Sequence, residues 1–320
     1  MRLGLLIGPE RGQYATKVEH LDATARWVED AGFSSLWIPQ IPDEFDVLTA
    51  ATIAGVATSR IEIGTAIVPI QPRHPIALAQ QVLSVQAVCE GRFTLGLGVS
   101  HHWVIDEMMG LPYEHPTLTM RCYLDVLDQA LRGPGTVDVH NELFRIHCAL
   151  DITDVAPTPV LLAALGPRML ALAGARTDGT SLWLADERAI SSHVVPALTR
   201  AAEAAGRAAP RIVAGIPVCL CRDDEVDVAY DRTNRLLSEA ETSPNYQRLL
   251  DIGKARCIGD ILAAGSEANL EKRLRSYAAA GVTDISARVV PIGEDADDRR
   301  VSLQRTREFL ASLVPSLTRE

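Results

Sequence analysis

Two adjacent histidines at the end of an apolar segment are the side chains best suited to acid–base chemistry. His101 and His102 follow residues 93–99, FTLGLGV, which are too continuously apolar for a half-exposed strand. An imidazole with an ordinary pKa exchanges protons near neutral pH, and neighbouring side chains of an extended chain point in opposite directions. We therefore expect His101 to act as a general acid or to contact a cofactor, with a hydrogen-bonded structural role as the alternative.

A second segment combines small residues, a helix start and a positive charge. Residues 159–170 read PVLLAALGPRML, in which an apolar run leads into Pro167, a residue suited to the first turn of a helix. Backbone N–H groups at a helix N-terminus bind anions, and Arg168 adds a cation beside them. We expect a phosphate site in this turn, made by Ala164, Leu165, Gly166, Pro167 and Arg168.

Two other motifs suggest different chemistry, and neither is complete. Residues 96–101, GLGVSH, begin like the GxGxxG fingerprint of dinucleotide-binding folds but carry histidine at the third glycine position. Cys219 and Cys221 would share one face of a strand, but no second pair of Cys or His completes a tetrahedral metal site. We expect these cysteines to be small core residues, and we expect no metal.

A repeating pattern along the chain positions these segments. An amphipathic helix, a turn containing Gly or Arg, and an apolar run follow one another repeatedly, which predicts strands near residues 2–7, 35–39, 61–68, 93–99, 160–164, 180–184, 211–220 and 283–290. Buried strands joined by helices run parallel, so their C-terminal ends meet on one side. The sequence therefore predicts an α/β fold, a (β/α)8 TIM barrel that forms a single domain over residues 1–320.

Two stretches interrupt this pattern. Residues 133–157 resemble a hairpin around an Asn141-Glu142 turn, and residues 240–262 resemble an irregular insertion after the seventh strand. Insertions on such barrels commonly cover the catalytic face, which lies at the C-terminal ends of the strands. We expect both to lie there.

Composition excludes several classes of partner. The chain has 320 residues and a net charge of -10, without a basic run that would bind nucleic acid. No apolar segment is long enough to span a membrane, and the first residues do not form a secretory signal. The six cysteines show no disulfide spacing. These features predict a soluble, cytoplasmic protein whose partner is a small-molecule substrate.

The order and spacing of these motifs resemble the luciferase-like monooxygenase superfamily, whose members are barrels that bind FMN or the deazaflavin coenzyme F420. The resemblance covers nearly the whole chain and rests on AGFSSLW, RIEIGTAIVPIQPRHPIALAQQ, GRFTLGLGVSHH and LLAALGPRMLALAGARTDG. Within the superfamily, the chain is most similar to the F420-dependent oxidoreductases, also labelled methylenetetrahydromethanopterin reductase-like.

The resemblance also implies which residues bind the cofactor. In this family a bulged third strand, often with a non-proline cis peptide, backs the deazaflavin ring, and the end of the fourth strand touches the ring and the tail. The matching positions are Thr65, Ala66 and Ile67 for the third strand and Val99, Ser100 and His101 for the fourth. The phosphate-binding turn of the family matches residues 164–168.

One position departs from the family pattern. Many relatives end the second strand with an acidic residue and a histidine near the centre of hydride transfer, where this chain reads Trp37-Ile38-Pro39-Gln40. The commonest candidate acid is therefore absent, which leaves Gln40 and His101 as the candidate catalytic residues.

The function that the resemblance implies is hydride transfer between F420 and a small organic substrate. One alternative is an FMN-dependent monooxygenase that uses oxygen, and another is a non-catalytic flavin-binding barrel. Family habit further implies a homodimer. The residues indicate neither the substrate nor the direction of the reaction.

Overall fold

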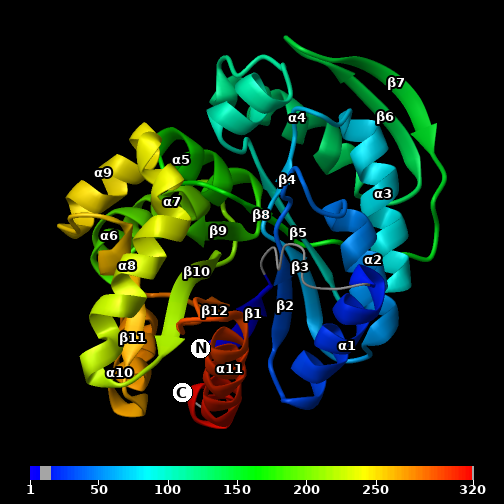
Figure 1. Cartoon of the computed structure of the whole chain (residues 1–320). Helices are drawn as coiled ribbons and strands as arrows, with labels where there is room; N and C mark the ends of the chain where they lie inside the picture. The colour runs from blue at the N-terminus through cyan, green and yellow to red at the C-terminus, as the bar shows by residue number, and fades with distance from the viewer. Residues whose placement is uncertain (8–15, 319–320) are drawn as a thin grey trace.

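The computed structural model describes residues 1–7 and 16–318 as a ring of strands surrounded by helices (Figure 1). Eight parallel strands close the ring in the order β1, β2, β3, β5, β8, β9, β10, β12, with β12 paired to β1. Their bounds are β1 (Arg2–Leu6), β2 (Ser35–Ile38), β3 (Glu62–Thr65), β5 (Phe93–Gly98), β8 (Val160–Leu162), β9 (Gly179–Trp183), β10 (Arg211–Leu220) and β12 (Asp284–Val289). The predicted (β/α)8 barrel is confirmed.

The helices pack around this ring. They are α1 (Lys17–Asp30), α2 (Val47–Ala57), α3 (Pro75–Val88), α4 (Pro116–Ala130), α5 (Pro167–Arg176), α6 (Glu187–Ala189), α7 (Val195–Ala204), α8 (Val226–Leu237), α9 (Pro244–Gly253), α10 (Glu267–Ala279) and α11 (Ala296–Thr318). No described helix is long and apolar enough to cross a membrane.

Two short strands extend the sheet beyond the eight. The third predicted strand is interrupted, because β3 ends at Thr65 and β4 (Val68–Pro69) resumes the pairing with β5. A further strand, β11 (Ala263–Gly265), pairs with the C-terminal part of β10. The sequence did not predict β11, since Ala-Ala-Gly carries no apolar run.

The two interruptions of the pattern form different structures. The predicted hairpin is present as β6 (Gly135–His140) and β7 (Arg145–Leu150), and it packs against α4. Residues 240–262, expected to be irregular, contain the helix α9. Its buried residues Tyr246, Leu249 and Leu250 recur at helical spacing, so the periodic signal was present there and was missed.

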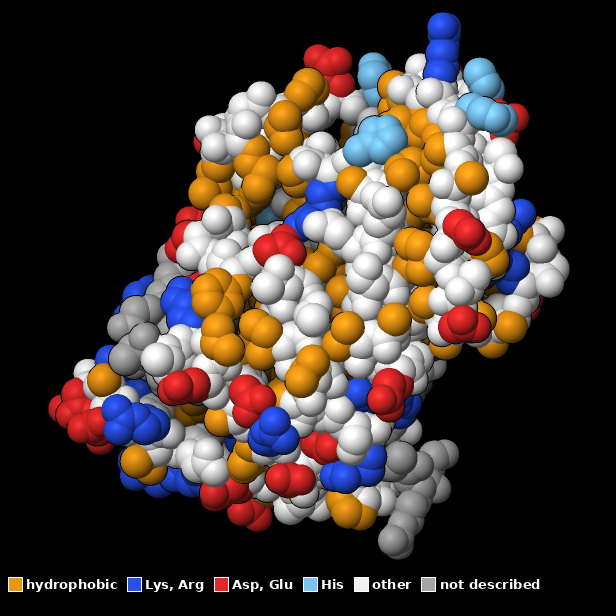
Figure 2. All heavy atoms as spheres, turned by 90° about the vertical axis from the view of Figure 1, so that its right-hand side faces the viewer, with side chains coloured by type: hydrophobic (Ala, Val, Ile, Leu, Met, Phe, Trp, Pro, Cys, Tyr) orange, Lys and Arg blue, Asp and Glu red, His pale blue; other side chains and the backbone are white. Residues whose placement is uncertain are grey.

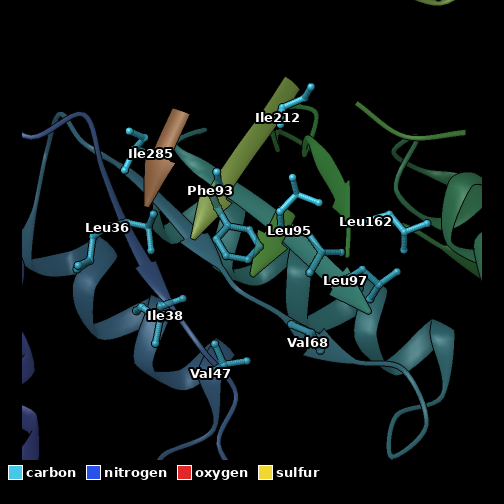
Figure 3. Close-up of a cluster of buried hydrophobic side chains, with 14 of the residues drawn as sticks. Leu36, Ile38, Val47, Val68, Phe93, Leu95, Leu97, Leu162, Ile212 and Ile285 are labelled. Atoms are coloured by element: carbon cyan, nitrogen blue, oxygen red, sulfur yellow. The ribbon is translucent and has the colours of Figure 1, made fainter. Parts of the chain in front are cut away.

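The hydrophobic residues of the strands divide between the outer and inner faces of the barrel. Phe93, Leu95 and Leu97 of β5 are fully buried in the cluster shown in Figure 3, together with residues of the surrounding helices. The alternate residues of the strands face the interior, where Trp37 packs with Leu6, Leu161, Val213 and the partly buried Trp183. The two indoles leave room only for glycine opposite them, because a Cβ at Gly64 would lie 2.3 Å from the Trp37 ring.

A network of charges closes the N-terminal end of the barrel. Arg211 bridges Glu62 at 3.0 Å and Asp284 at 2.7 Å, and Arg2 also contacts both carboxylates. Burial raises the pKa of Glu62, but hydrogen bonds and charge attraction from Arg211 outweigh it and lower the pKa overall. This end is therefore filled, which leaves the C-terminal ends of the strands as the open mouth.

The cysteine pair lies in the core, as the sequence predicts. Cys219 and Cys221 are buried in a small apolar cluster with Ala229 and Ile292. Within the described ranges, no group of three or more His, Cys, Asp or Glu side chains is placed to hold a metal ion.

Candidate active site

His101 lies at the mouth, immediately after β5. The backbone turns there through Ser100, whose φ of 57° is in the left-handed region that non-glycine residues rarely adopt. The imidazole stacks on Trp103, with ring centroids 4.2 Å apart and planes at 14°, and lies 5.8 Å from the ring of Tyr246. Neither ring nitrogen of His101 has a hydrogen-bond partner among the described residues, so the imidazole is held by aromatic packing alone.

The protonation state of His101 differs from the expected one. Burial, assisted by the charge of His102, lowers the pKa of His101 from its ordinary value to about 4. The imidazole is therefore neutral near pH 7, and it can donate a hydrogen bond but is not an imidazolium acid. The sequence did not show that aromatic rings enclose this side chain, and the role of His101 as a general acid or a cofactor contact stays a prediction.

His102 begins a helical turn, with φ of -58° and ψ of -42°, so the extended backbone expected at the two histidines is absent. Its ring is half exposed, meets Trp103 edge-on and lies 4.0 Å from the carboxylate of Glu107. Its side chain therefore belongs to the rim of the mouth.

The candidate catalytic residue Gln40 follows β2 and is occupied by structural contacts. Its side-chain oxygen accepts a hydrogen bond from the backbone N–H of Val47 at 3.1 Å, the first residue of α2. The same oxygen contacts Arg73, whose guanidinium pairs with Asp46. Gln40 thus anchors the start of α2, and its contact with substrate stays a prediction.

The break in the third strand is where the family resemblance locates the ring of the cofactor. The peptide bond between Ala66 and Ile67 is cis. Ala66 is partly exposed and packs against the indole cluster, and Ile67 packs against Gly98, where a Cβ would lie 2.7 Å from the Ile67 side chain. Val99 and Ser100 are also partly exposed beside this break.

Thr65 differs from its neighbours because its hydroxyl makes two hydrogen bonds inside the core. Its Oγ1 donates to the carbonyl of Gly96 and accepts from the N–H of Gly96, both at 2.9 Å, and the residue is 0% exposed. Thr65 lies on the same face of β3 as Ile63, which packs toward the helices. The hydroxyl therefore does not face the mouth, and a cofactor contact at Thr65, which stays a prediction, would involve the backbone.

The predicted phosphate turn follows β8, next to β5 in the ring. Gly166 is the N-cap of α5 and supplies no side-chain cap, so backbone N–H groups of the first turn are open. Pro167 and Arg168 are exposed, and Arg168 has no hydrogen bond or ion pair with any residue in 1–7 or 16–318. The carbonyl of Leu165 is 3.1 Å from His193 Nε2, which fixes the turn.

Helix α9 adds a second cation that the sequence did not indicate. A Cβ at Gly166 would lie 3.2 Å from Asn245 Oδ1 and 3.3 Å from an Arg248 guanidinium nitrogen. Both side chains come from the insertion 240–262, which thus reaches the mouth as expected for an insertion on the catalytic face. Arg168 and Arg248 together make this side of the mouth cationic.

Three further residues of the mouth were missed because they carry no motif. Gln71 donates from Nε2 to the Val99 carbonyl at 2.8 Å, and its buried side-chain oxygen has no partner among the described residues. Tyr246 is buried beside Leu165 and Trp183. Only the periodicity of α9 could have indicated Tyr246, and nothing in the sequence around Gln71 or Trp183 indicates a site.

Known proteins share this architecture. The family model of luciferase-like monooxygenases matches residues 1–284. A Mycobacterium tuberculosis protein, provisionally named a coenzyme F420-dependent oxidoreductase, is 30% identical over 201 residues, which are 58% of this chain and 55% of that protein. The 5,10-methylenetetrahydromethanopterin reductase of Methanopyrus kandleri is 27% identical over 236 residues, 68% of this chain and 66% of that enzyme. The aligned region thus spans 55% and 66% of the lengths of these two relatives.

Solved structures agree on the fold. The F420-dependent tetrahydromethanopterin reductase of Methanopyrus kandleri superposes with a TM-score of 0.72 at 22% identity, covering 98% of both chains. The oxygenating constituent of 3,6-diketocamphane monooxygenase from Pseudomonas putida, in complex with FMN, gives 0.77 at 15% identity over 98% of both chains. Both are similar in fold, although their names include different cofactors. The match to residues 1–284 and the shared barrel establish that this chain belongs to the luciferase-like monooxygenase family.

Proposed function

We propose that the protein is an F420-dependent oxidoreductase that transfers a hydride between the deazaflavin and a small organic substrate. The relatives named above as F420-dependent support this choice of cofactor. One observation carries the proposal. The unpartnered side-chain oxygen of Gln71 and the cationic N-terminus of α5 follow strands that flank β5 in the barrel, so both lie at the same mouth. Such a mouth offers one site for a polar ring and another for a phosphate.

The residues present fit such a cofactor. The side-chain nitrogen of Gln71 donates to the Val99 carbonyl, whereas its side-chain oxygen has no partner among the described residues. This oxygen can therefore accept a hydrogen bond from a ring N–H of the cofactor. The open N-terminus of α5, with Arg168 and Arg248 beside it, suits a phosphate. Gly166 leaves a space there that a Cβ would fill.

When bound, the deazaflavin supplies the hydride, and the protein supplies binding, orientation and exclusion of water. Trp37 and Trp183 fill the barrel beneath the mouth and keep water from below. The neutral imidazole of His101 can donate a hydrogen bond to substrate without placing a charge next to the reacting carbon.

An FMN-dependent monooxygenase is the second candidate, and the FMN complex among the structural neighbours favours it. A phosphate at α5 and a ring beside Gln71 would serve FMN as well as F420. The two cofactors differ in chemistry, because the deazaflavin transfers hydride and hardly reacts with oxygen, whereas reduced flavin reacts with oxygen readily. The non-catalytic barrel would bind one of them without turnover.

A turnover assay distinguishes the three candidates. The purified protein is incubated without oxygen with reduced F420 and a panel of uncharged carbonyl compounds, and the returning fluorescence of oxidised F420 is recorded. We expect enzyme-dependent oxidation of reduced F420 with at least one compound. Oxygen consumption that requires reduced FMN instead indicates a monooxygenase, and binding without either reaction indicates a non-catalytic barrel.

We also propose a homodimer that pairs through α2 and α3. Neither helix contains a charged residue, although both lie on the outer wall of the barrel. Val56 on α2 is 71% exposed, and Val88 on α3 is also exposed. Figure 2 looks onto this side of the molecule and shows hydrophobic side chains scattered across its centre among uncharged ones, with many of the charged side chains toward its lower edge and others above and to the right. A second copy of the same uncharged surface would cover these side chains.

A further inference from the structure

A hydroxyl without a hydrogen-bond partner among the described residues lies at the mouth, on Tyr246 of α9. The residue is 7% exposed and packs with Leu184, Leu250 and Trp183. Its hydroxyl donates no hydrogen bond to any residue in 1–7 or 16–318. The oxygen of this hydroxyl is not fully buried, unlike that of Tyr277, so a ligand at the mouth can reach it. A ligand atom that accepts this bond would complete the arrangement.

The neighbours of Tyr246 locate it between the turn at residues 164–168, where it packs near Leu165, and His101. Its ring lies 5.8 Å from that of His101, which follows β5 directly. Tyr113 is close enough for its charge to influence Tyr246, and the hydroxyl of Tyr113 donates to the Ser100 carbonyl at 3.1 Å. The proton of Tyr113 is therefore already engaged, whereas that of Tyr246 is free to be donated.

The other candidate donors at the mouth are less suited. Burial keeps His101 neutral at physiological pH, and its pKa of about 4 removes the imidazolium form. The Gln40 side chain is bound to the start of α2 and does not titrate. Burial raises the pKa of Tyr246, so its phenol keeps its proton at neutral pH.

The wall around the hydroxyl indicates the class of substrate. His101 lies against Trp103 and Tyr246, and Tyr113 lies 6.5 Å from the neighbouring His102, so four aromatic side chains without a formal charge at neutral pH line this part of the mouth. Stacked rings favour a flat, conjugated molecule, and an uncharged enclosure disfavours a carboxylate or phosphate. The arginines of the mouth, Arg168 on α5 and Arg248 on α9, flank the turn at residues 164–168 that is assigned above to the cofactor phosphate.

We propose that Tyr246 is a catalytic residue that donates its proton to the carbonyl oxygen of an uncharged, planar, conjugated substrate. This inference rests on the proposed function, in which reduced F420 supplies the hydride. As the hydride forms a bond to the carbonyl carbon, the C=O π bond breaks and its electron pair moves to oxygen. That oxygen takes the proton of Tyr246, F420 is oxidised, and the phenolate regains a proton from water. The transfer is favourable because an alkoxide is a stronger base than a phenolate.

The test compares Tyr246→Phe with Tyr230→Phe, a control on α8 that keeps every residue of the mouth. F420 affinity is measured by fluorescence for each protein, and single-turnover oxidation of reduced F420 is then followed with 2-cyclohexenone, benzaldehyde and 4-carboxybenzaldehyde. In Tyr246→Phe we expect the rate constant to fall by about 10²- to 10⁴-fold, with F420 affinity and substrate KM changed less than about threefold. Tyr230→Phe should match wild type, and wild type should prefer benzaldehyde to its carboxylated form.

Each contrary result overturns a different statement. If wild type turns over and Tyr246→Phe retains its rate, Tyr246 is not the donor, although the proposed function stands. If wild type binds F420 but reduces neither uncharged probe, or prefers 4-carboxybenzaldehyde, the substrate class is wrong. If wild type does not bind F420, the proposed function fails and this inference fails with it.

Discussion

Replacing Thr65 by valine should destabilise the fold much more than it weakens cofactor binding. The ladder between β3 and β5 ends at the pair Gly64 and Thr94. Two residues further along β5, the backbone N–H and C=O of Gly96 are hydrogen-bonded to the Thr65 hydroxyl instead. The hydroxyl thus replaces backbone pairing where the third strand breaks. Thr65→Val keeps the shape of the side chain but leaves a buried N–H and a buried C=O of Gly96 without this partner.

The magnitude follows from those two groups. Each unsatisfied buried group costs about 1 to 3 kcal/mol, so the free energy of unfolding should fall by about 2 to 6 kcal/mol. Urea denaturation followed by tryptophan fluorescence measures this as a lower midpoint with an unchanged slope. Thr65→Ser is the matched control, because it keeps the hydroxyl and loses only a methyl group, at about 1 kcal/mol.

The contrary result is equally clear. If Thr65→Val kept the wild-type midpoint while F420 affinity fell about tenfold or more, the hydroxyl would face the cofactor. The assignment of Thr65 to the core would then be wrong.

Three further predictions follow from the mouth and the outer wall. Arg168→Ala should weaken F420 binding about tenfold to a hundredfold in a fluorescence titration, because a charged hydrogen bond contributes about 1.5 to 3 kcal/mol; an unchanged Kd would contradict the phosphate assignment. The folded-state pKa of His101 is depressed to about 4, so stability is fully present above about pH 6.5 and falls by up to roughly 3 kcal/mol as the pH drops toward 4. His101→Phe should remove that pH dependence from urea midpoints measured between pH 4 and 7.5, and an unchanged dependence would show that His101 is solvated. Val56→Asp should convert a dimer to a monomer in light-scattering measurements, whereas Val301→Asp, at the similarly exposed Val301 of α11, should not; a monomeric wild type would refute the pairing.

The barrel was predictable because its signals are local. Buried parallel strands read as continuous apolar runs, and Gly or Arg turns mark the junctions, so residues 35–38, 93–98 and 211–220 agree with their predicted strands. The strand β11 consists of three small residues that carry no strand signal of their own. It forms because β10 is long enough to offer a free edge for pairing, and the sequence does not show that edge. Helix α9 was missed because its helical periodicity covers only a few buried residues, and the residues around it show no clear apolar pattern.

The site was predictable only where a turn or strand end fixes the backbone. The turn at residues 164–168 lies at the N-terminus of α5 as its Gly-Pro pair predicts. The environments of His101 and Thr65 were not predictable, because the low pKa of one and the hydrogen bonds of the other depend on Trp103 and Gly96 in the folded state. Tyr246 and Arg248 reach the mouth by tertiary packing of an insertion, for which no spacing rule exists.

The account depends most directly on which cofactor the mouth binds. Titration of the purified protein with oxidised F420, following the quenching of its fluorescence, measures this without knowledge of the substrate. We predict saturable binding with a micromolar or lower Kd, weakened by Arg168→Ala and at least tenfold tighter than binding of FMN in a parallel titration. Tight binding of FMN with no saturable binding of F420 would contradict the account.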